Sequence, residues 1–463
     1  MLTYSFENRG SDSLYEYLYK QIKGDILAFR LAPEEKLPSK RALAKHLNIS
    51  IITIEGAYGQ LMAEGYIYSV PKSGYYVSRL SGTLRQPPEA PAAEEAAESA
   101  PIFADFVGTH SERSSFPFPV WTRLMREIMS DSPDKLMVRS PSAGVMELRE
   151  AIAEHLRSFR GMNVRPEQIV VGAGTEYLYG LIIQLLGRNS RYGVEDPGYR
   201  KISRIYEANS VDCVHIPMDD KGIDTDALIK SGADVLHISP SHHFPSGIVT
   251  PVSRRYELLS WACSAPGRYI IEDDYDSEFR LMGKPIPSLR SIDLMGKVIY
   301  INTFSKSLSS TIRISYMVLP EALMAEYEKR LSFYSCTVSN FDQYTLAAFI
   351  RSGQLEKHIN RMRSLYRTRR NALISRIKSS RHYGFVKIKE EDAGLHFLLE
   401  LDTELTDSEI VSRCRERGLR VSCLSEYYRE SAGLSRTLLI NYSGLDSEFI
   451  PEAVERLFDC IFS

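Results

Sequence analysis

The sequence predicts an α/β protein in which a small helical unit precedes a large domain built around a mixed, mostly parallel sheet. Three observations predict this class. Apolar residues recur at helical spacing between residues 12 and 65, and from about residue 102 short apolar runs alternate with helical patterns. Between them lies a segment rich in Pro, Ala, Glu and Ser. At 463 residues the chain has material for more than one domain.

The composition narrows the class of protein. The formal net charge is −2, so the protein could bind a nucleic acid or a membrane only through a local charged patch. The six cysteines show no paired metal-ligand spacing and are typical of reduced thiols in a cytosol. The sequence has neither a signal-peptide pattern nor an apolar run of membrane-spanning length. We therefore expect a soluble cytoplasmic protein with no membrane partner and no metal.

Residues 1–80 contain the parts of a winged helix-turn-helix. An apolar residue stands at every fourth position from Leu14 to Ile26, which predicts a first helix. Ser39 is a plausible N-cap for a second helix, and a third ends at Gly65. Two short strands follow, joined by Pro71-Lys72-Ser73-Gly74. Three helices and a hairpin are the components of this DNA-binding fold.

Three motifs in this segment, LPSKRALAKHLNIS, TIEGAYGQLMAEGYI and PKSGYYV, resemble the DNA-binding domain of GntR-type bacterial regulators. The basic run at the second helix contains no acids and suits phosphates, although a solvated basic face is the alternative. The resemblance implies a double-stranded DNA operator as partner. It implies DNA contacts from Lys36, Lys40, Arg41, Lys45, Ser50, Thr53 and Lys72.

The sequence departs from GntR-type regulators at the start of the recognition helix. Such regulators usually carry an arginine directly after the serine that begins this helix, whereas Ser50 is followed here by Ile51 and Ile52. The two isoleucines could touch thymine methyl groups. The alternative is weaker or unusual DNA recognition.

Residues 81–101 separate the two patterns. Leu84 is the only large apolar residue among them. Because such a segment cannot bury enough apolar surface to order itself, we expect a flexible linker. The predicted organisation is a DNA-binding domain over residues 1–80, this linker, and a large domain over residues 102–463.

Polar clusters follow the apolar runs of the large domain. A glycine turn, Gly172-Ala173-Gly174-Thr175, follows one run and opens a helix, where free backbone N–H groups could meet a phosphate. Glu272-Asp273-Asp274-Tyr275 follows another, and Asn302-Thr303-Phe304-Ser305-Lys306 follows a third. Because the carboxyl ends of parallel strands meet at one crevice, we expect these groups to lie together.

An acid, a phenol, hydroxyls, a lysine and an arginine in one crevice are what a pyridoxal phosphate site needs. The lysine forms an imine with the cofactor aldehyde, and the acid keeps the pyridine nitrogen protonated so that the ring can act as an electron sink. Cations and hydroxyls hold the phosphate. A single lysine after a serine is more often a surface residue, so the ordered set carries this prediction.

Seven motifs resemble the fold type I aminotransferases, over about residues 115–460: LREAIAEHL, VVGAGTEYL, EDPGY, SPSHHFPSG, IIEDDYDSEFR, TFSKSLSSTIRISY and SRTLLINYSGL. The resemblance implies a large pyridoxal-phosphate transferase fold with a smaller C-terminal α+β subdomain. It implies that Lys306 carries the cofactor, Asp273 contacts the ring nitrogen and Tyr275 the ring hydroxyl. Arg436 would clamp a substrate carboxylate. The phosphate would be surrounded by Gly174, Thr175, Ser305 and Arg313. Apart from the resemblance, Tyr199 in the loop after Glu195-Asp196-Pro197-Gly198 is placed to stack on a flat cofactor ring, although a loop tyrosine more often only packs.

The large domain departs from the common enzymes at one motif. They usually carry Asn-Pro-x-Gly where this chain has Phe244-Pro245-Ser246-Gly247, so the asparagine that would bond the ring hydroxyl is missing. His243 and Tyr275 are both candidates to replace it. His242 and His243 could instead bind a metal, but no partner spacing supports that alternative. The arginine-rich segment 361–370 is interpreted as an exposed or interface helix rather than a second DNA patch.

A GntR-type winged helix, a linker and an aminotransferase-like domain, in this order, resemble the MocR/GabR family of bacterial transcription regulators. The resemblance implies a head-to-tail homodimer in which pyridoxal phosphate, or an amine or amino acid bound to it, alters DNA binding. Two alternatives stay open. One is a working aminotransferase with a DNA-binding appendage, and the other is a regulator whose large domain serves only for dimerisation.

Overall fold

The structure is a computed structural model that describes residues 2–6, 9–79, 101–108, 116–281, 286–390, 394–430 and 435–462. The chain divides into two compact units, residues 1–97 and 98–463. Apart from Pro101, the expected linker lies outside the described residues. All six cysteines are free thiols. In the part of the chain that the structure describes, no helix combines the length and apolarity needed to cross a bilayer.

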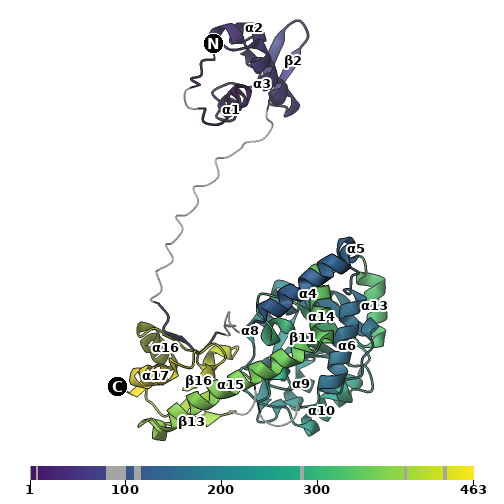
Figure 1. The fold of residues 1–463 in the computed structure, drawn as a ribbon, viewed down its shortest axis with the longest axis vertical. Coiled ribbons are helices and arrows are strands. Elements are labelled where there is room, and N and C mark those ends of the chain that lie inside the picture. The colour runs from purple at the N-terminus through teal and green to yellow at the C-terminus, as the bar shows by residue number, and fades with distance from the viewer. Residues whose placement is uncertain are drawn as a thin grey trace. The chain divides into compact units, whose positions relative to one another are not determined.

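The N-terminal unit is a winged helix-turn-helix, as predicted (Figure 1). Its elements are α1 (Leu14–Leu27), β1 (Lys36–Leu37), α2 (Lys40–Leu47), α3 (Ile51–Ala63), β2 (Ile67–Val70) and β3 (Gly74–Val77). The strands form an antiparallel sheet in the order β1-β3-β2, so the predicted hairpin gains a third strand. Ser39 and Ser50 cap α2 and α3, because each hydroxyl accepts a hydrogen bond from a backbone N–H in the first turn.

The apolar stripe of α1 forms the core of this unit. Leu18 and Ile22 are fully buried, and they belong to one cluster with Ile54 and Leu61 of α3. The hydroxyl of Tyr58, also in this core, donates a 2.9 Å hydrogen bond to the carbonyl of Pro38. This bond ties α3 to the turn that precedes α2.

The second unit is organised around an eight-stranded sheet in the order β5-β12-β11-β10-β9-β6-β7-β8. The strands are β5 (Ile169–Gly172), β6 (Tyr192–Asp196), β7 (Cys213–Asp219), β8 (Gly222–Ile223), β9 (Val235–Ile238), β10 (Tyr269–Asp273), β11 (Val298–Thr303) and β12 (Ser315–Val318). The sheet is parallel except for β8 and for β12, which runs antiparallel to both of its neighbours. The prediction of a mixed, mostly parallel sheet is confirmed.

Successive residues of the central strands face opposite sides of this sheet, and each side carries an apolar layer. Tyr316 and Val318 of β12 join one cluster, whereas Met317 between them joins the other. Helices α6 and α14 cover the first side, and α7 and α13 cover the second. The helices of this part are α4 (Phe118–Asp131), α5 (Pro133–Met137), α6 (Met146–Arg160), α7 (Thr175–Leu186), α8 (Arg200–Ala208), α9 (Thr225–Ser231), α10 (Val252–Cys263), α11 (Leu289–Ile292), α12 (Phe304–Ser307), α13 (Glu321–Leu331) and α14 (Asn340–Arg351).

A smaller α+β subdomain follows, and the long helix α15 (Gln354–Lys378) runs into it from the helices of the large part (Figure 1). Its antiparallel sheet has the order β13-β14-β16, and β15 pairs with β4 near the start of the unit. The elements are β4 (Ala104–Asp105), β13 (Val386–Lys389), β14 (His396–Leu401), α16 (Asp407–Glu416), β15 (Leu419–Arg420), β16 (Thr437–Asn441) and α17 (Ile450–Phe462). One apolar cluster holds them together.

The arginines of α15 serve the interior of this unit. Arg363 donates to the carbonyl of Glu278, and the buried Arg369 donates to that of Ser443. Arg370 is buried as well. The buried Arg369 and Arg370 therefore do not fit an exposed helix, whereas Arg361 and Arg367 of the same segment are exposed, and an interface role stays a prediction. The same burial argues against a second DNA patch.

Candidate functional site

A cavity of about 370 Å³ lies where the carboxyl ends of β5, β10 and β11 approach the C-terminal subdomain. Among the residues that line it are seven of those predicted from the sequence: Thr175, Tyr199, Asp273, Tyr275, Ser305, Lys306 and Arg313. Gly174 adjoins them, because a Cβ atom placed there would lie 2.4 Å from Nη2 of Arg313. Its φ of +95° also favours glycine. The fold therefore brings together residues from four separate motifs.

Lys306 stands on the short helix α12, directly after β11. Burial lowers the pKa of its amine, and the nearby carboxylate of Asp276 partly opposes this shift. A lowered pKa increases the neutral fraction, which is the form that attacks a carbonyl carbon. The site thus holds a lysine suited to covalent chemistry.

Asp273 ends β10 with its carboxylate at the cavity. Its Oδ2 accepts a 2.5 Å hydrogen bond from the hydroxyl of Tyr179, whereas its Oδ1 is buried with no hydrogen-bond partner among the described residues. A buried carboxylate oxygen without a donor is rare, and a protonated ring nitrogen would satisfy it. Sequence analysis missed Tyr179. The signal was its position four residues after Thr175, which places both on one face of α7.

Two of the residues expected at a phosphate, Gly174 and Thr175, form the N-terminus of α7. Thr175 is its first residue, so unsatisfied backbone N–H groups and the helix dipole favour an anion here. Arg313 forms an ion pair with Glu176, which also pairs with Lys201. A phosphate entering the cavity would compete with Glu176 for Arg313. The donor set therefore fits pyridoxal phosphate at both the ring and the phosphate ends.

The structure separates the two candidates for the missing asparagine. Tyr275 lines the cavity, and its hydroxyl lies 3.2 Å from Nδ1 of His242, which also bonds Asp276. His243 is buried but is not one of the residues that line the cavity. Its Nδ1 is hydrogen-bonded to the Ser246 hydroxyl. Tyr275 is thus the candidate placed to meet a ring hydroxyl. Among the described residues no group of three or more metal-ligating side chains is found.

Arg436 is not brought to the cavity. It precedes β16, its side chain is 34% exposed, and its Nη2 lies 3.9 Å from Glu404. Asn441, at the other end of β16, does line the cavity. Five residues of extended strand separate the two, about 17 Å. Arg436 is therefore not among the residues that line the cavity, and its assignment to a substrate carboxylate stays a prediction.

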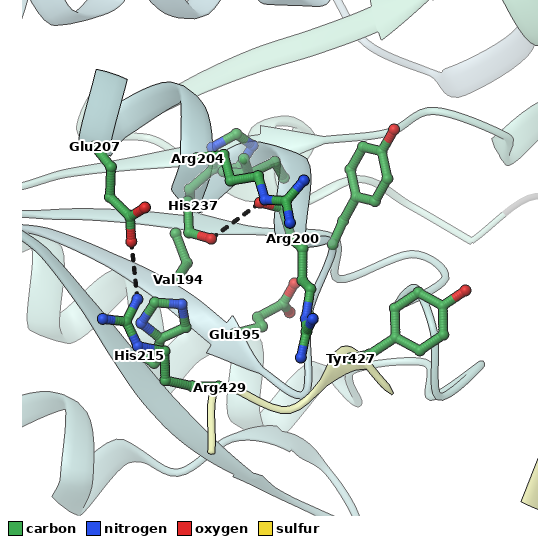
Figure 2. Close-up of a pocket in the computed structure, with 13 residues that line it drawn as sticks. Val194, Glu195, Arg200, Arg204, Glu207, His215, His237, Tyr427 and Arg429 are labelled. Carbon is green, nitrogen blue, oxygen red and sulfur yellow. Dashed lines mark hydrogen bonds and ion pairs between the residues drawn. The ribbon is translucent and has the colours of Figure 1, made fainter. Parts of the chain in front are cut away.

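A second cavity, of about 270 Å³, adjoins the first. The two share Tyr199, Ile202 and Tyr427. Figure 2 shows three arginines around it, Arg200, Arg204 and Arg429. Arg429 comes from the C-terminal segment, and its guanidinium pairs with the carboxylate of Glu207 at 2.8 Å. Glu195 also lines this cavity, and burial raises the pKa of its carboxyl well above the usual range. Of the predicted cofactor residues, this cavity contains only Tyr199.

The predicted DNA contacts occupy four places in the N-terminal unit. Lys40, Arg41 and Lys45 stand on α2, while Lys36 is on β1 and Lys72 in the hairpin turn. The Ser50 hydroxyl caps α3 through the backbone N–H of Thr53.

The side chains at these places differ in solvent exposure and in whether their charge is paired. Arg41 and Lys45 are exposed, whereas Lys40 pairs with Glu55 at 2.6 Å. Ile52 is 79% exposed at the start of α3, so its apolar side chain is open to contact. The N-terminal unit therefore offers both cationic and apolar contacts.

Comparisons with known proteins agree with both units. Residues 14–77 match the model of the bacterial regulatory proteins of the gntR family, and residues 109–457 match that of the class I and II aminotransferases. The HTH-type transcriptional regulator YdeL of Bacillus subtilis is 38% identical over 98% of each chain. The chain belongs to the MocR/GabR family of transcription regulators.

Other members of the MocR/GabR family match over nearly their whole length. The probable rhizopine catabolism regulatory protein MocR of Rhizobium meliloti is 28% identical over 96% of this chain and 93% of its own. The pyridoxine biosynthesis regulator PdxR of Corynebacterium glutamicum is 28% identical over 97% and 96%. A kynurenine aminotransferase structure from Pyrococcus horikoshii shares the fold of the large unit, with a TM-score of 0.68 and 23% identity over 78% of this chain and 91% of its own. This MocR/GabR member is thus a transcription regulator with an aminotransferase-like domain.

Proposed function

We propose that this regulator binds pyridoxal 5'-phosphate and that the cofactor, or an amine or amino acid bound to it, sets the affinity for operator DNA. The observation that carries the proposal is the meeting, in one cavity, of the half-buried Lys306 amine and the Oδ1 atom of Asp273, which has no hydrogen-bond partner among the described residues. When bound, the cofactor supplies an aldehyde and a ring that can act as an electron sink.

Each residue has a role in holding this group. Lys306 holds it covalently, and Asp273 keeps the ring nitrogen protonated. Tyr275 bonds the ring hydroxyl, and Tyr199 packs against the ring. The phosphate is held by Gly174, Thr175, Ser305 and Arg313. PdxR, a relative by sequence, is a pyridoxine biosynthesis regulator, which supports the cofactor class.

The cofactor is tested by covalent trapping. Purified protein should be yellow, and borohydride should fix the cofactor on Lys306, as peptide mass analysis would show. Lys306→Ala should abolish the linkage, whereas Lys201→Ala, the other lysine of the cavity, should keep it. Protein that stays colourless and takes up no added pyridoxal phosphate would contradict the proposal.

The protein acts as a head-to-tail homodimer on double-stranded DNA in this proposal. Arg41→Ala should weaken operator binding and reduce the slope of log affinity against log salt by roughly one unit if it meets a phosphate. A 1–80 fragment should bind more weakly than the full chain, because the dimer supplies a second half-site. Equal affinities of fragment and full chain would show that the dimer is not needed.

The effector and the operator must be coupled in both directions. An effector can shift DNA affinity only by its differential affinity for two states, typically about 1–3 kcal/mol, and DNA must shift effector affinity by the same factor. The loaded protein is titrated with an amine, with and without operator DNA, and the absorbance of the bound cofactor is recorded. The ratio of the two dissociation constants is this factor. Identical dissociation constants for every binding amine would exclude equilibrium coupling.

An aminotransferase activity is the second candidate. The lowered pKa of Lys306 favours it, because a neutral amine near the cofactor can also carry a proton. Release of product from an amino donor in the presence of a keto acid tests this function. Loss of that turnover in Lys306→Ala, with turnover kept in Lys201→Ala, would support it.

A further inference from the structure

The neutral side chains that line the cavity from the C-terminal subdomain include two from its sheet, and the sequence analysis predicted neither of these two. His396 of β14 and Asn441 of β16 stand directly opposite each other in antiparallel register. Both line the cavity that holds Lys306. Opposed residues on one face of a sheet have Cβ atoms about 5 Å apart. One small ligand group can therefore touch both.

His396 presents a hydrogen-bond acceptor. Its Nε2 lies 3.0 Å from the carbonyl oxygen of Pro245, which can only accept, so Nε2 carries the hydrogen. Burial holds the pKa of His396 well below its usual range, and His242, His243 and Lys306 add repulsion. The ring is therefore neutral, and Nδ1 keeps its lone pair.

Asn441 presents a hydrogen-bond donor. Its Oδ1 accepts from both the backbone N–H of Ser443, at 2.9 Å, and the Ser443 hydroxyl, at 2.7 Å. The backbone N–H can only donate, so this atom is the amide oxygen and the NH₂ group points elsewhere. Because Asn441 is buried and lines the cavity, its NH₂ is the atom group left for a ligand.

We propose that His396 and Asn441 recognise the far end of the amine effector, and that this end is a carboxamide rather than a carboxylate. This inference rests on the proposed function. A carboxamide oxygen accepts from Asn441 while its NH₂ donates to His396. A carboxylate would instead place a second lone pair against Nδ1 of His396, which is unfavourable in a buried site.

The charges of the cavity agree with a neutral end group. Arg436, the arginine expected to bind a carboxylate, lies outside the lining. Lys201 and Arg313, two cations that do line the cavity, share Glu176. The neutral side chains of His396 and Asn441 thus take the place of a cation in binding the far end of the ligand.

Matched pairs of amines test this inference on the full-length, cofactor-loaded protein. Glycine and glycinamide, β-alanine and β-alaninamide, and 4-aminobutyrate and 4-aminobutanamide differ only in the end group, and propylamine lacks it. The absorbance of the bound cofactor reports binding. The carboxamide should bind about tenfold more tightly than its carboxylate at the chain length that reaches the pair.

Variants assign the preference to the pair. Asn441→Leu and His396→Phe should each bring the carboxamide down to the affinity of propylamine while the cofactor absorbance is kept. His382→Phe is the matched control, because this ring stacks on Phe462 rather than lining the cavity. A response to amines without any carboxamide preference overturns this inference alone. A loaded protein that responds to none of the amines overturns it together with the amine effector.

Discussion

The hydroxyl of Tyr179 donates a 2.5 Å hydrogen bond to Oδ2 of Asp273, and both groups are buried. The bond turns the carboxylate so that Oδ1, which has no partner among the described residues, is left for a ligand. It also joins α7, whose N-terminus is the expected phosphate site, to β10, which carries the acid. The two ends of the proposed cofactor are therefore positioned by one contact.

Tyr179→Phe should weaken cofactor retention. A hydrogen bond to a charged group contributes about 1.5–3 kcal/mol, so the dissociation constant of pyridoxal phosphate should rise about tenfold or more. Equilibrium dialysis of the variant against cofactor-free buffer measures this. Tyr177→Phe, two residues earlier on α7, should retain the cofactor like the parent protein. Unchanged retention in Tyr179→Phe would show that the bond does not position Asp273.

The rate of cofactor uptake by cofactor-free protein should rise with pH and level off below pH 10.5, the ordinary pKa of lysine. Burial lowers the pKa of Lys306, so the neutral amine that attacks the aldehyde is fully formed at a lower pH. Stopped-flow absorbance across the pH range measures the plateau. Asp276→Asn should move the plateau to still lower pH, because the carboxylate favours the charged amine. A rate that still climbs above pH 10.5 would contradict the shift.

Glu278→Gln should remove part of the pH dependence of stability. Burial, with Asp274 nearby, raises the pKa of Glu278 to about 8. The folded state therefore keeps this proton at pH values where the unfolded state, with a pKa near 4.5, has released it. The free energy of unfolding then falls by about 1.4 kcal/mol per pH unit between these values and is level above them.

The measurement for Glu278 is chemical denaturation from pH 5.5 to 8.5. The parent protein should lose stability across this range more steeply than Glu278→Gln. Glu147→Gln is the control, because the pKa of that half-buried carboxyl is lowered rather than raised, so it is ionised in both the folded and the unfolded state from pH 5.5 to 8.5 and its removal should leave the shape of the pH profile unchanged. Parallel pH profiles for the parent and Glu278→Gln would show that the buried acid is not protonated.

Glu55→Gln should strengthen DNA binding. Glu55 neutralises Lys40 on the face expected to meet phosphates, with their charged groups 2.6 Å apart. Removing the acid frees one cation, so the slope of log affinity against log salt should steepen by about 0.9. Fluorescence anisotropy on duplex DNA at several salt concentrations measures it. Glu64→Gln is the control. The carboxylate of Glu64 pairs at 2.8 Å with Lys23 of α1, which is not a predicted DNA contact, so its loss should leave the slope unchanged.

Features with a local signal could be predicted from the sequence. The Ser39 cap of α2, the glycine turn before Thr175 and the apolar runs that became β10 and β11 all lie within a few residues of the structure they specify. The polar residues after each run also reached a common edge, because parallel strands place their carboxyl ends together.

The sequence by itself therefore determined the two kinds of domain, their order, and the set of residues around Lys306. Only the tertiary structure decided which distant side chains reach the cavity. Arg436 matched a motif, yet it is not among the residues that line the cavity, while Asn441 at the other end of β16 lines it beside His396. Cross-strand register and strand length arise from packing between segments far apart in the chain, so no local pattern records them.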